Sequence, residues 1–408
     1  MLFALQQVLA VFVATVLIAN ICGTPISSCL LGACLGTLTY QLITRFRSPA
    51  FISSCGATVS AVIGALALGD SGANYLAVAI GGLVIALVYI TFALLIKFRG
   101  IEVFNRIFPS IIVGPITMVI GINLAGFIPT YVGTETIPML VALFTMFVIA
   151  IVSHYTKGFV KSIAFLIGIL SGYLVSLILT ITNVAPLIDF SIFDNLQIVA
   201  LPEFTFLKWD FAAFKWSMLL DIVILFAPVA ICSSLEHYSD HRVLSAIIGE
   251  DLTKDPGLHR TLVADGVASA LGTIIGGQPN TTYGESVAAI GFSRIASVWV
   301  ITTAAAILGL LSFFPPVAAF IRSIPSCVFG GCAMILYGYI ASSGLKTLIT
   351  SKIDLNNNKN LIVVSVILTV GVSGVFLFTQ SLAGVALAMI LGVMLNLILK
   401  DKKPIDKE

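Results

Sequence analysis

Stretches of about twenty apolar residues recur along almost the whole of this chain, and they restrict its fold more than any other feature. A helix of about twenty such residues crosses the ~30 Å hydrocarbon core of a bilayer. Hydrophobic residues make up 59% of the sequence and charged residues only 10%, so a water-soluble fold could not bury the apolar surface. We predict an all-α polytopic membrane protein of about fourteen segments. They lie near 3–22, 26–44, 50–69, 75–97, 104–123, 137–154, 160–180, 216–240, 259–277, 281–292, 295–314, 317–338, 359–376 and 383–399.

The basic residues predict how the chain is oriented. If the N-terminus is placed in the cytoplasm, only three of the 21 lysines and arginines lie on the outer side of the membrane: Lys208, Lys215 and Arg322. Short loops on the cytoplasmic side of membrane proteins carry an excess of Lys and Arg. We therefore expect a protein of the plasma (inner) membrane with both termini in the cytoplasm. The sequence has no nucleotide-binding loop, metal-ligand spacing or nucleic-acid patch. The expected partners are therefore the lipid bilayer and a small solute, with no cofactor.

Two short segments recur in the second half of the chain. IFPSIIVGPITM (107–118) matches SIPSCVFGGCAM (323–334), and RSPAF (47–51) resembles GQPNT (277–281). Both matches run in the same order, and the repeat unit holds seven predicted segments. An odd number of segments makes the second copy enter from the opposite side, which predicts two inverted 7-segment repeats. Secondary transporters with this architecture bind solute near the membrane midplane, where the repeats meet.

Predicted segments 3 and 10 are unusual because each opens with a proline and an extended stretch, SPAFIS (48–53) and QPNTTY (278–283). Proline removes a backbone donor and moves the preceding residue out of helical geometry, while Thr and Tyr favour extended backbone. Irregular backbone at membrane depth is tolerated only where protein buries it or where it lines a cavity. The pair therefore indicates a binding site. The alternative is that both stretches are re-entrant turns or loop ends.

Four carboxyl groups within the predicted segments are candidates for solute and proton binding: Glu236, Asp240, Asp265 and Glu285. Inserting a carboxylate at the centre of a membrane helix costs about 2.5–3.5 kcal/mol on insertion scales, so each of these residues is expected to have a functional or structural role. Glu236 and Asp240 share a helix face, and Glu285 follows Gly284 at an expected helix start. Two carboxylates that face one cavity repel, so one is expected to hold a proton and make H⁺ the coupling ion. For Asp240 and Asp265, structural pairing that orients helices is the alternative.

His237 and His241 are also four residues apart, and with Asp240 they could resemble a metal site. The charged residues that follow them predict the end of the helix. We therefore interpret both as solvated histidines at a helix end, with no metal.

At these positions the chain resembles the nucleobase–ascorbate transporter (nucleobase:cation symporter) family, and within it the bacterial uracil permeases. The resemblance extends over nearly the whole chain. The residues that carry it are PAFIS (49–53), LEH (235–237), DLTKDPGLHRTLVADG (251–266), QPNTTYGE (278–285), SRI (293–295) and IPSCVFGGCAMILYGYIASSG (324–344).

The resemblance implies a core domain, 1–100 and 216–314, that moves against a gate domain, 101–215 and 315–400, usually in a homodimer, with a cytoplasmic tail at 401–408. It also implies short antiparallel strands in segments 3 and 10. The solute-binding residues that it implies are Glu236, Glu285, the backbone of Phe51 and Gly284, the apolar or aromatic walls Phe51, Tyr283 and Tyr337, and the nearby Ala14.

The sequence departs from the uracil permeases at two places. Asp240 stands where they carry His, and this residue and the ADG around Asp265 look more like the xanthine and urate branch, whereas Glu285 is uracil-like. Ser286 stands where the family normally has Asn. We expect proton-coupled import of a nucleobase, uracil first and xanthine second. The rival hypotheses are an anion transporter on the same fold, whose solute the carboxylates would repel, and a membrane-embedded enzyme, which inverted repeats do not favour.

Overall fold

The protein is described from a computed structural model that covers residues 2–68, 74–102, 109–194, 196–212, 214–377 and 379–399. Within these ranges, eight helices are long and apolar enough to cross a membrane, or nine if one bent pair counts as a single span. The tail at 401–408 and the start of the fifth predicted segment lie outside the described residues.

The helices of the first half are α1 (Leu2–Cys22), α2 (Ile26–Ile43), α3 (Val59–Leu66), α4 (Tyr75–Arg99), α6 (Ser110–Ala125), α7 (Ile128–Val132), α8 (Thr136–Tyr155), α9 (Gly158–Ser162) and α10 (Ala164–Ile181). Those of the second half are α11 (Met218–Ile248), α12 (Leu258–Ile275), α13 (Gly284–Ser293), α14 (Val298–Leu311), α15 (Pro315–Arg322), α16 (Ser326–Thr350), α17 (Asn358–Ser373) and α18 (Val385–Ile398). Short helical turns lie at η1 (Gly56–Thr58), η2 (Phe190–Phe193), η3 (Thr205–Lys208) and η4 (Thr253–Gly257).

Two short strands, β1 (Ile52–Ser54) and β2 (Asn280–Thr282), lie inside predicted segments 3 and 10 and pair antiparallel. In their register Ser53 faces Thr281. The pairing continues beyond the strands, because the amide of Tyr283 donates to the carbonyl of Phe51 at 3.1 Å and that of Cys55 to Pro279 at 3.0 Å. Each strand leads into a helical segment, η1 and α3 after β1 and α13 after β2. The backbone groups that a broken helix would leave bare are thus satisfied inside the protein.

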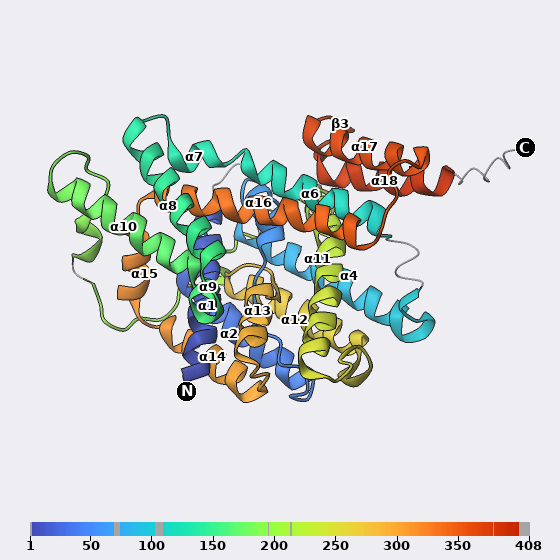
Figure 1. The fold of residues 1–408 in the computed structure, drawn as a ribbon, viewed down its shortest axis with the longest axis horizontal. Coiled ribbons are helices and arrows are strands. Elements are labelled where there is room, and N and C mark those ends of the chain that lie inside the picture. The colour runs from blue at the N-terminus through green and yellow to red at the C-terminus, as the bar shows by residue number, and fades with distance from the viewer. Residues whose placement is uncertain are drawn as a thin grey trace, which may run out of the picture.

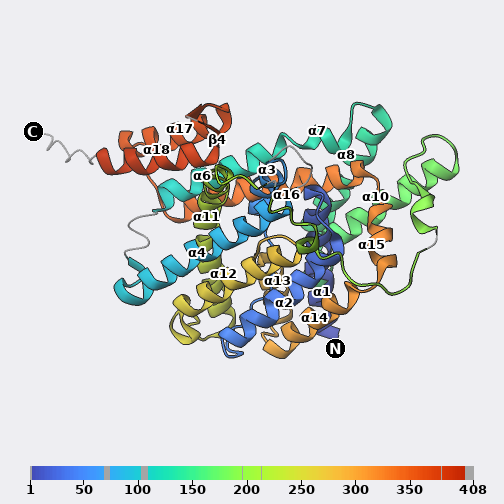
Figure 2. The ribbon, with the colours of Figure 1, turned by 180° about the vertical axis from the view of Figure 1, so that it is seen from behind.

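The helices fall into two groups. In Figures 1 and 2, α6, α16, α17 and α18 run along the upper side, while α2, α12, α13 and α14 lie below them. Within the lower group α12 packs against α2 and α4, and within the upper group α16 packs against α6 and α8. The strand pair lies in the lower group, in contact with α1, α2, α11 and α12.

Glycines allow the closest helix contact in the upper group. A Cβ on Gly344 of α16 would lie 2.3 Å from the carbonyl oxygen of Gly114 in α6, and one on Gly121 would lie 2.5 Å from the amide nitrogen of Ala341. Gly114 thus faces Gly344, and Gly121 faces the earlier residue Ala341, so α6 and α16 run antiparallel. Small residues at such contacts let two membrane helices approach backbone to backbone.

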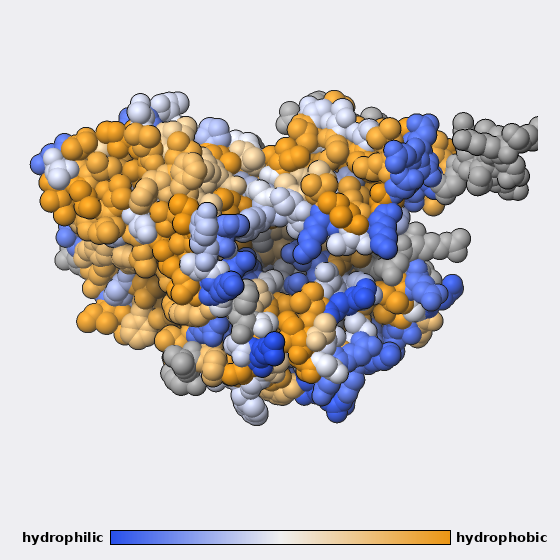
Figure 3. All heavy atoms as spheres, viewed as in Figure 1, coloured by the Kyte–Doolittle hydropathy of each residue, from blue (hydrophilic) through white to orange (hydrophobic). Residues whose placement is uncertain are grey.

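An apolar surface covers the outer side of α8 and α10. Figure 3 shows hydrophobic atoms gathered on the left of the molecule, where Figure 1 places these helices. Large apolar side chains on this surface are exposed: Leu140, Phe147, Ile151, Leu174, Ile178 and Ile181. Such a patch is too large for a water-exposed monomer and suits contact with lipid.

Three segment predictions need correction. The segments predicted at 295–314 and 317–338 are instead α14 and α15, bent by 81°, followed by α16, which reaches Thr350. Pro315 and Pro325 cause the difference, because a proline lacks the N–H that continues a helix and so begins a new one. The segment predicted to end at 240 extends to Ile248, because hydropathy reports the apolar part of a helix and not its polar continuation. A β-hairpin, β3 (Phe376–Leu377) with β4 (Thr379–Ala383), separates α17 from α18 and was not predicted.

Candidate functional site

Glu285 lies in the first turn of α13, directly after the strand pair. Tyr283, whose backbone is still extended, precedes the helix. The first amides of a helix have no intrahelical partner and carry partial positive charge, so this turn favours an acidic side chain. Gly284 is exposed, and a Cβ there would meet no atom within 4 Å. The approach to Glu285 is therefore open.

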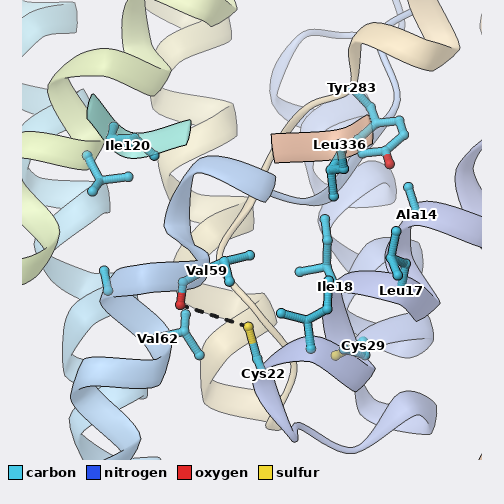
Figure 4. Packing of buried hydrophobic residues seen from close by; sticks show 14 of the residues in the cluster. Ala14, Leu17, Ile18, Cys22, Cys29, Val59, Val62, Ile120, Tyr283 and Leu336 are labelled. Atoms are coloured by element: carbon cyan, nitrogen blue, oxygen red, sulfur yellow. Dashed lines mark hydrogen bonds between the residues drawn. The ribbon is translucent and has the colours of Figure 1, made fainter. Parts of the chain in front are cut away.

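Glu285 lines a pocket between the two helix groups. Its wall on the α1 side consists of Leu9, Ala10, Val13, Ala14 and Leu17. The opposite wall consists of Leu336 in α16 with Ile163, Phe165 and Leu166 at the start of α10. Figure 4 shows Ala14, Leu336 and Tyr283 pointing toward one another. A carboxyl group among apolar walls is a typical small-solute site, with one polar group fixing the orientation of the solute.

Glu236 lies at the middle of α11 and is exposed, although Ser233 and His237 on either side of it are buried. Its charge interacts with those of Glu285 and Asp265. Asp240, one turn further on, interacts with the same groups, and its Oδ2 is buried without a hydrogen-bond partner among the described residues. All four predicted carboxyl groups therefore lie on elements next to the strand pair: α11 contacts β2, Asp265 accepts from the amide of Thr282, and Glu285 lies in the helix that follows β2.

The three predicted aromatic residues have different surroundings. Phe51 and Tyr283 are buried beside the strands, and the carbonyl of Phe51 is occupied by the amide of Tyr283. Tyr337 is buried too, but Leu336, its neighbour in α16, is the residue that lines the Glu285 pocket. Leu336 was not predicted as a site residue, because adjacent residues on a helix face different directions and only packing shows which one faces a pocket.

The interpretation of the histidines as solvated is wrong, because His237 and His241 are both 0% exposed. His237 Nδ1 lies 2.6 Å from Asp265 Oδ2, and His237 Nε2 lies 2.9 Å from Thr261 Oγ1. The error has the same cause as the short prediction of α11, since the helix continues for two turns past Asp240 and other helices cover it. No group of three or more metal-ligand side chains occurs among the described residues.

Asp265 also binds the second strand. Its Oδ2 accepts from Thr281 Oγ1 at 3.1 Å and from the amide of Thr282 at 3.3 Å. Tyr89 of α4 adds a further link, because its hydroxyl donates to Ser233 Oγ at 2.9 Å and lies 3.4 Å from Thr281 Oγ1. Thr261 and Tyr89 were not predicted as site residues, and His237 was predicted only as a solvated histidine. The signal that could have pointed to Tyr89 was Ser233, because a hydroxyl buried within an apolar helix needs a hydrogen-bond partner from a neighbouring element.

Known proteins resemble this chain in sequence and in fold. A model of a permease family matches residues 1–380. The uracil permease of Bacillus subtilis is 38% identical, covering 98% of this chain and 92% of that protein. The uracil permease of Escherichia coli K12 is 35% identical, with 97% and 90% covered. A putative pyrimidine permease, RutG, from the same strain is 30% identical, with 97% and 88% covered.

Two anion transporters have a similar fold at low sequence identity. The transmembrane domain of the cyanobacterial bicarbonate transporter BicA has a TM-score of 0.64 at 14% identity, with 97% of this chain and 95% of that chain covered. The murine anion transporter Slc26a9, in an inward-facing state, has a TM-score of 0.65 at 12% identity, with 98% and 67% covered. At such identities the likeness concerns the fold alone.

Proposed function

Because this chain belongs to the nucleobase–ascorbate transporter family and is a membrane transporter rather than an enzyme, we propose that it imports uracil together with a proton. The observation that carries this proposal is the position of Glu285, an acidic side chain at a helix start facing an apolar pocket. The relatives named uracil permeases, which align over nearly the whole chain, support uracil as the solute.

The chemistry of the pocket suits a flat, uncharged ring with N–H and C=O groups. An ionised carboxylate accepts from a ring N–H, and a protonated carboxyl donates to a ring carbonyl. Glu236 and Glu285, whose charges interact, supply one group of each kind when they share a proton. We assign solute binding to Glu236, Glu285, Gly284, Phe51, Tyr283 and Ala14, with Leu336 in the place predicted for Tyr337, and proton coupling to Glu236, Asp240, Asp265 and Glu285.

For the architecture we propose fourteen segments in two inverted repeats, with the core and gate boundaries that the sequence predicts. The support is the antiparallel strand pair between corresponding segments, together with the antiparallel packing of α6 and α16, which begin at the matched Pro109 and Pro325. Import then follows from an elevator-like movement of the core against the gate in a homodimer, with both termini in the cytoplasm.

Uptake of labelled uracil into proteoliposomes, driven by an outside-acid pH gradient, tests the proposal. We expect concentrative uptake that a protonophore abolishes, and competition by unlabelled uracil at the lowest concentration within a panel that includes xanthine, uric acid, adenine and thymine. Uptake that ignores the pH gradient, or that is blocked equally by every base, contradicts it.

The second candidate solute is xanthine. Asp240 favours it, because its buried, unpartnered oxygen adds an acceptor that a purine with more N–H groups could use. Stronger competition by xanthine than by uracil would select this candidate. Because BicA and Slc26a9 have a similar fold, the same vesicles should also be tested for exchange of sulfate or bicarbonate.

The substitution Ala14→Leu is expected to weaken uracil binding. Ala14 is 8% exposed and lines the Glu285 pocket, so three added carbon atoms occupy space that the solute needs. We expect KM for uracil to rise by about 10-fold or more, since a clash of 1–3 kcal/mol is typical of overpacking. The matched control is Ala306→Leu, an exposed alanine of α14 that does not line the pocket, and it should leave KM unchanged. An unchanged KM for the Ala14 variant would show that α1 does not contact the solute.

A further inference from the structure

His237 and Asp265 form a fully buried pair beside β2, and neither residue lines the pocket of Glu285. Both side chains are 0% exposed, and His237 Nδ1 lies 2.6 Å from Asp265 Oδ2. A separation this short between a nitrogen and an oxygen requires a hydrogen atom between them, because two lone pairs would repel. The bond joins α11 to α12 and so connects the helix of Glu236 with a helix beside β2.

The other side of His237 determines how many protons the pair holds. Thr261 Oγ1, 2.9 Å from His237 Nε2, donates its own hydrogen to the carbonyl of Leu258 at 3.1 Å. The threonine oxygen therefore accepts, and Nε2 must carry a hydrogen. With Nε2 protonated, the hydrogen between Nδ1 and Asp265 is a second proton on the pair. It is the proton that the pair can lose while His237 stays neutral.

His241 keeps a second positive charge away from this pair. Its ring stacks on that of His237 with centroids 4.1 Å apart, and its Nδ1 donates to the carbonyl of His237 at 2.8 Å. Its Nε2 lies 2.7 Å from the hydroxyl of Tyr40 and 3.3 Å from that of Ser48. Because the Tyr40 hydroxyl donates to Ser48 Oγ at 2.9 Å, the Ser48 hydroxyl is the one that can donate to Nε2, and with that bond His241 is satisfied as a neutral ring. A neutral neighbour allows His237 to hold the extra proton.

The remaining titratable groups around the pair are acidic or neutral. From α11 these are Glu236 and Asp240, from α4 Tyr89, from α2 Tyr40, and from the turn after β1 Cys55. Among the described residues whose charges act on the pair, none is a lysine or arginine. No fixed positive charge therefore stands beside the pair among these groups.

From this geometry we propose that, among the proton-coupling groups, the His237–Asp265 pair holds the proton that is released to the cytoplasm, while Glu236 and Glu285 keep the shared proton that binds the solute. The inference rests on the proposed function, which supplies a proton-coupled solute. In the loaded state one proton lies between Nδ1 and Oδ2. Release leaves two acceptors facing each other at 2.6 Å, unless Thr261 turns its hydroxyl from Leu258 to His237. Either change alters the contact between α11 and α12.

The strand β2 transmits this change to the solute site. Asp265 Oδ2 binds the side chain of Thr281 and the amide of Thr282, and Glu285 follows Thr282 by three residues. A movement of the Asp265 carboxyl group therefore shifts the backbone that leads into the first turn of α13. Proton release and solute release are linked through a single strand, without a direct contact between the proton and the base.

Exchange and concentrative uptake of uracil separate this role from a structural one. Exchange of labelled for unlabelled uracil needs no net proton movement, whereas accumulation under a pH gradient does. In Asp265→Asn the amide oxygen can take the place of Oδ2 and keep accepting from Nδ1, Thr281 Oγ1 and the Thr282 amide, while the neutral amide has no proton that it can lose. We expect exchange within about threefold of the unsubstituted chain and accumulation reduced to an inside-to-outside ratio of about 1.

His237→Gln provides an independent second variant, because it removes the other end of the bond and leaves Asp265 its two threonine donors. It should likewise keep exchange and lose accumulation. Asp221→Asn, the same chemical change at the outer end of α11, is the control and should retain both activities. Accumulation by either folded pair variant, or loss of exchange in proportion to accumulation, overturns the inference. Absence of uracil exchange in the unsubstituted chain contradicts the proposed function and the inference with it.

Discussion

Glu285→Gln is expected to reduce uracil uptake by about 10- to 100-fold, because a hydrogen bond to a charged group contributes roughly 1.5–3 kcal/mol and each 1.4 kcal/mol is tenfold. Glu285 supplies the acidic group in the pocket between α1 and α16, and the apolar side chains there cannot replace it. The amide keeps the shape of the side chain and the turn of α13, so membrane insertion and folding should be unchanged. Initial rates of uptake, normalised to the amount of protein in the membrane, measure the effect.

Glu250→Gln is the matched control, since Glu250 is exposed beyond the end of α11 and the same chemical change there should leave uptake as it is. Uptake at the unsubstituted level by the Glu285 variant would show that the solute does not use this carboxyl group. The pocket would then have to be assigned to lipid or to packing between the helix groups.

Gly344→Ala is expected to destabilise the transporter strongly. The added Cβ would lie 2.3 Å from the carbonyl oxygen of Gly114 and 2.6 Å from the amide nitrogen of Met118, and backbone atoms cannot move aside as a flexible side chain does. Overpacking of this kind typically costs about 1–3 kcal/mol, and a clash with backbone falls at or above the upper end. We expect a lower thermal midpoint in detergent and less folded protein in the membrane.

Gly338→Ala tests whether the effect comes from the helix contact. Gly338 lies in the same helix, and a Cβ there would meet no atom within 4 Å, so the loss of glycine alone should leave stability unchanged or slightly raised. Equal thermal midpoints for the two variants would mean that α6 and α16 are not in backbone contact in the folded protein.

The antiparallel strands illustrate how far sequence reasoning reaches. Pro49 and Pro279 indicated that two segments leave helical geometry, and in the structure β1 begins at Ile52, shortly after Pro49, and β2 begins directly after Pro279. The register of Ser53 with Thr281 was not predictable, since it depends on contacts between residues more than 200 positions apart. Likewise, the carboxyl groups were found because a charge within an apolar run is rare. The histidine that binds one of them stood in a polar run, where a histidine needs no special account.

What the sequence determined by itself follows from local physics. Three features act within a single segment: the length of an apolar run, the prolines that end or begin a helix, and the scarcity of charge. They are readable from sequence because a membrane helix satisfies its own backbone hydrogen bonds and its apolar surface contacts lipid, whatever its neighbours are. Only the tertiary structure decided which side chains share an environment. It paired His237 with Asp265, turned Leu336 rather than Tyr337 toward Glu285, and bent α14 from α15, because each of these depends on how separate helices pack.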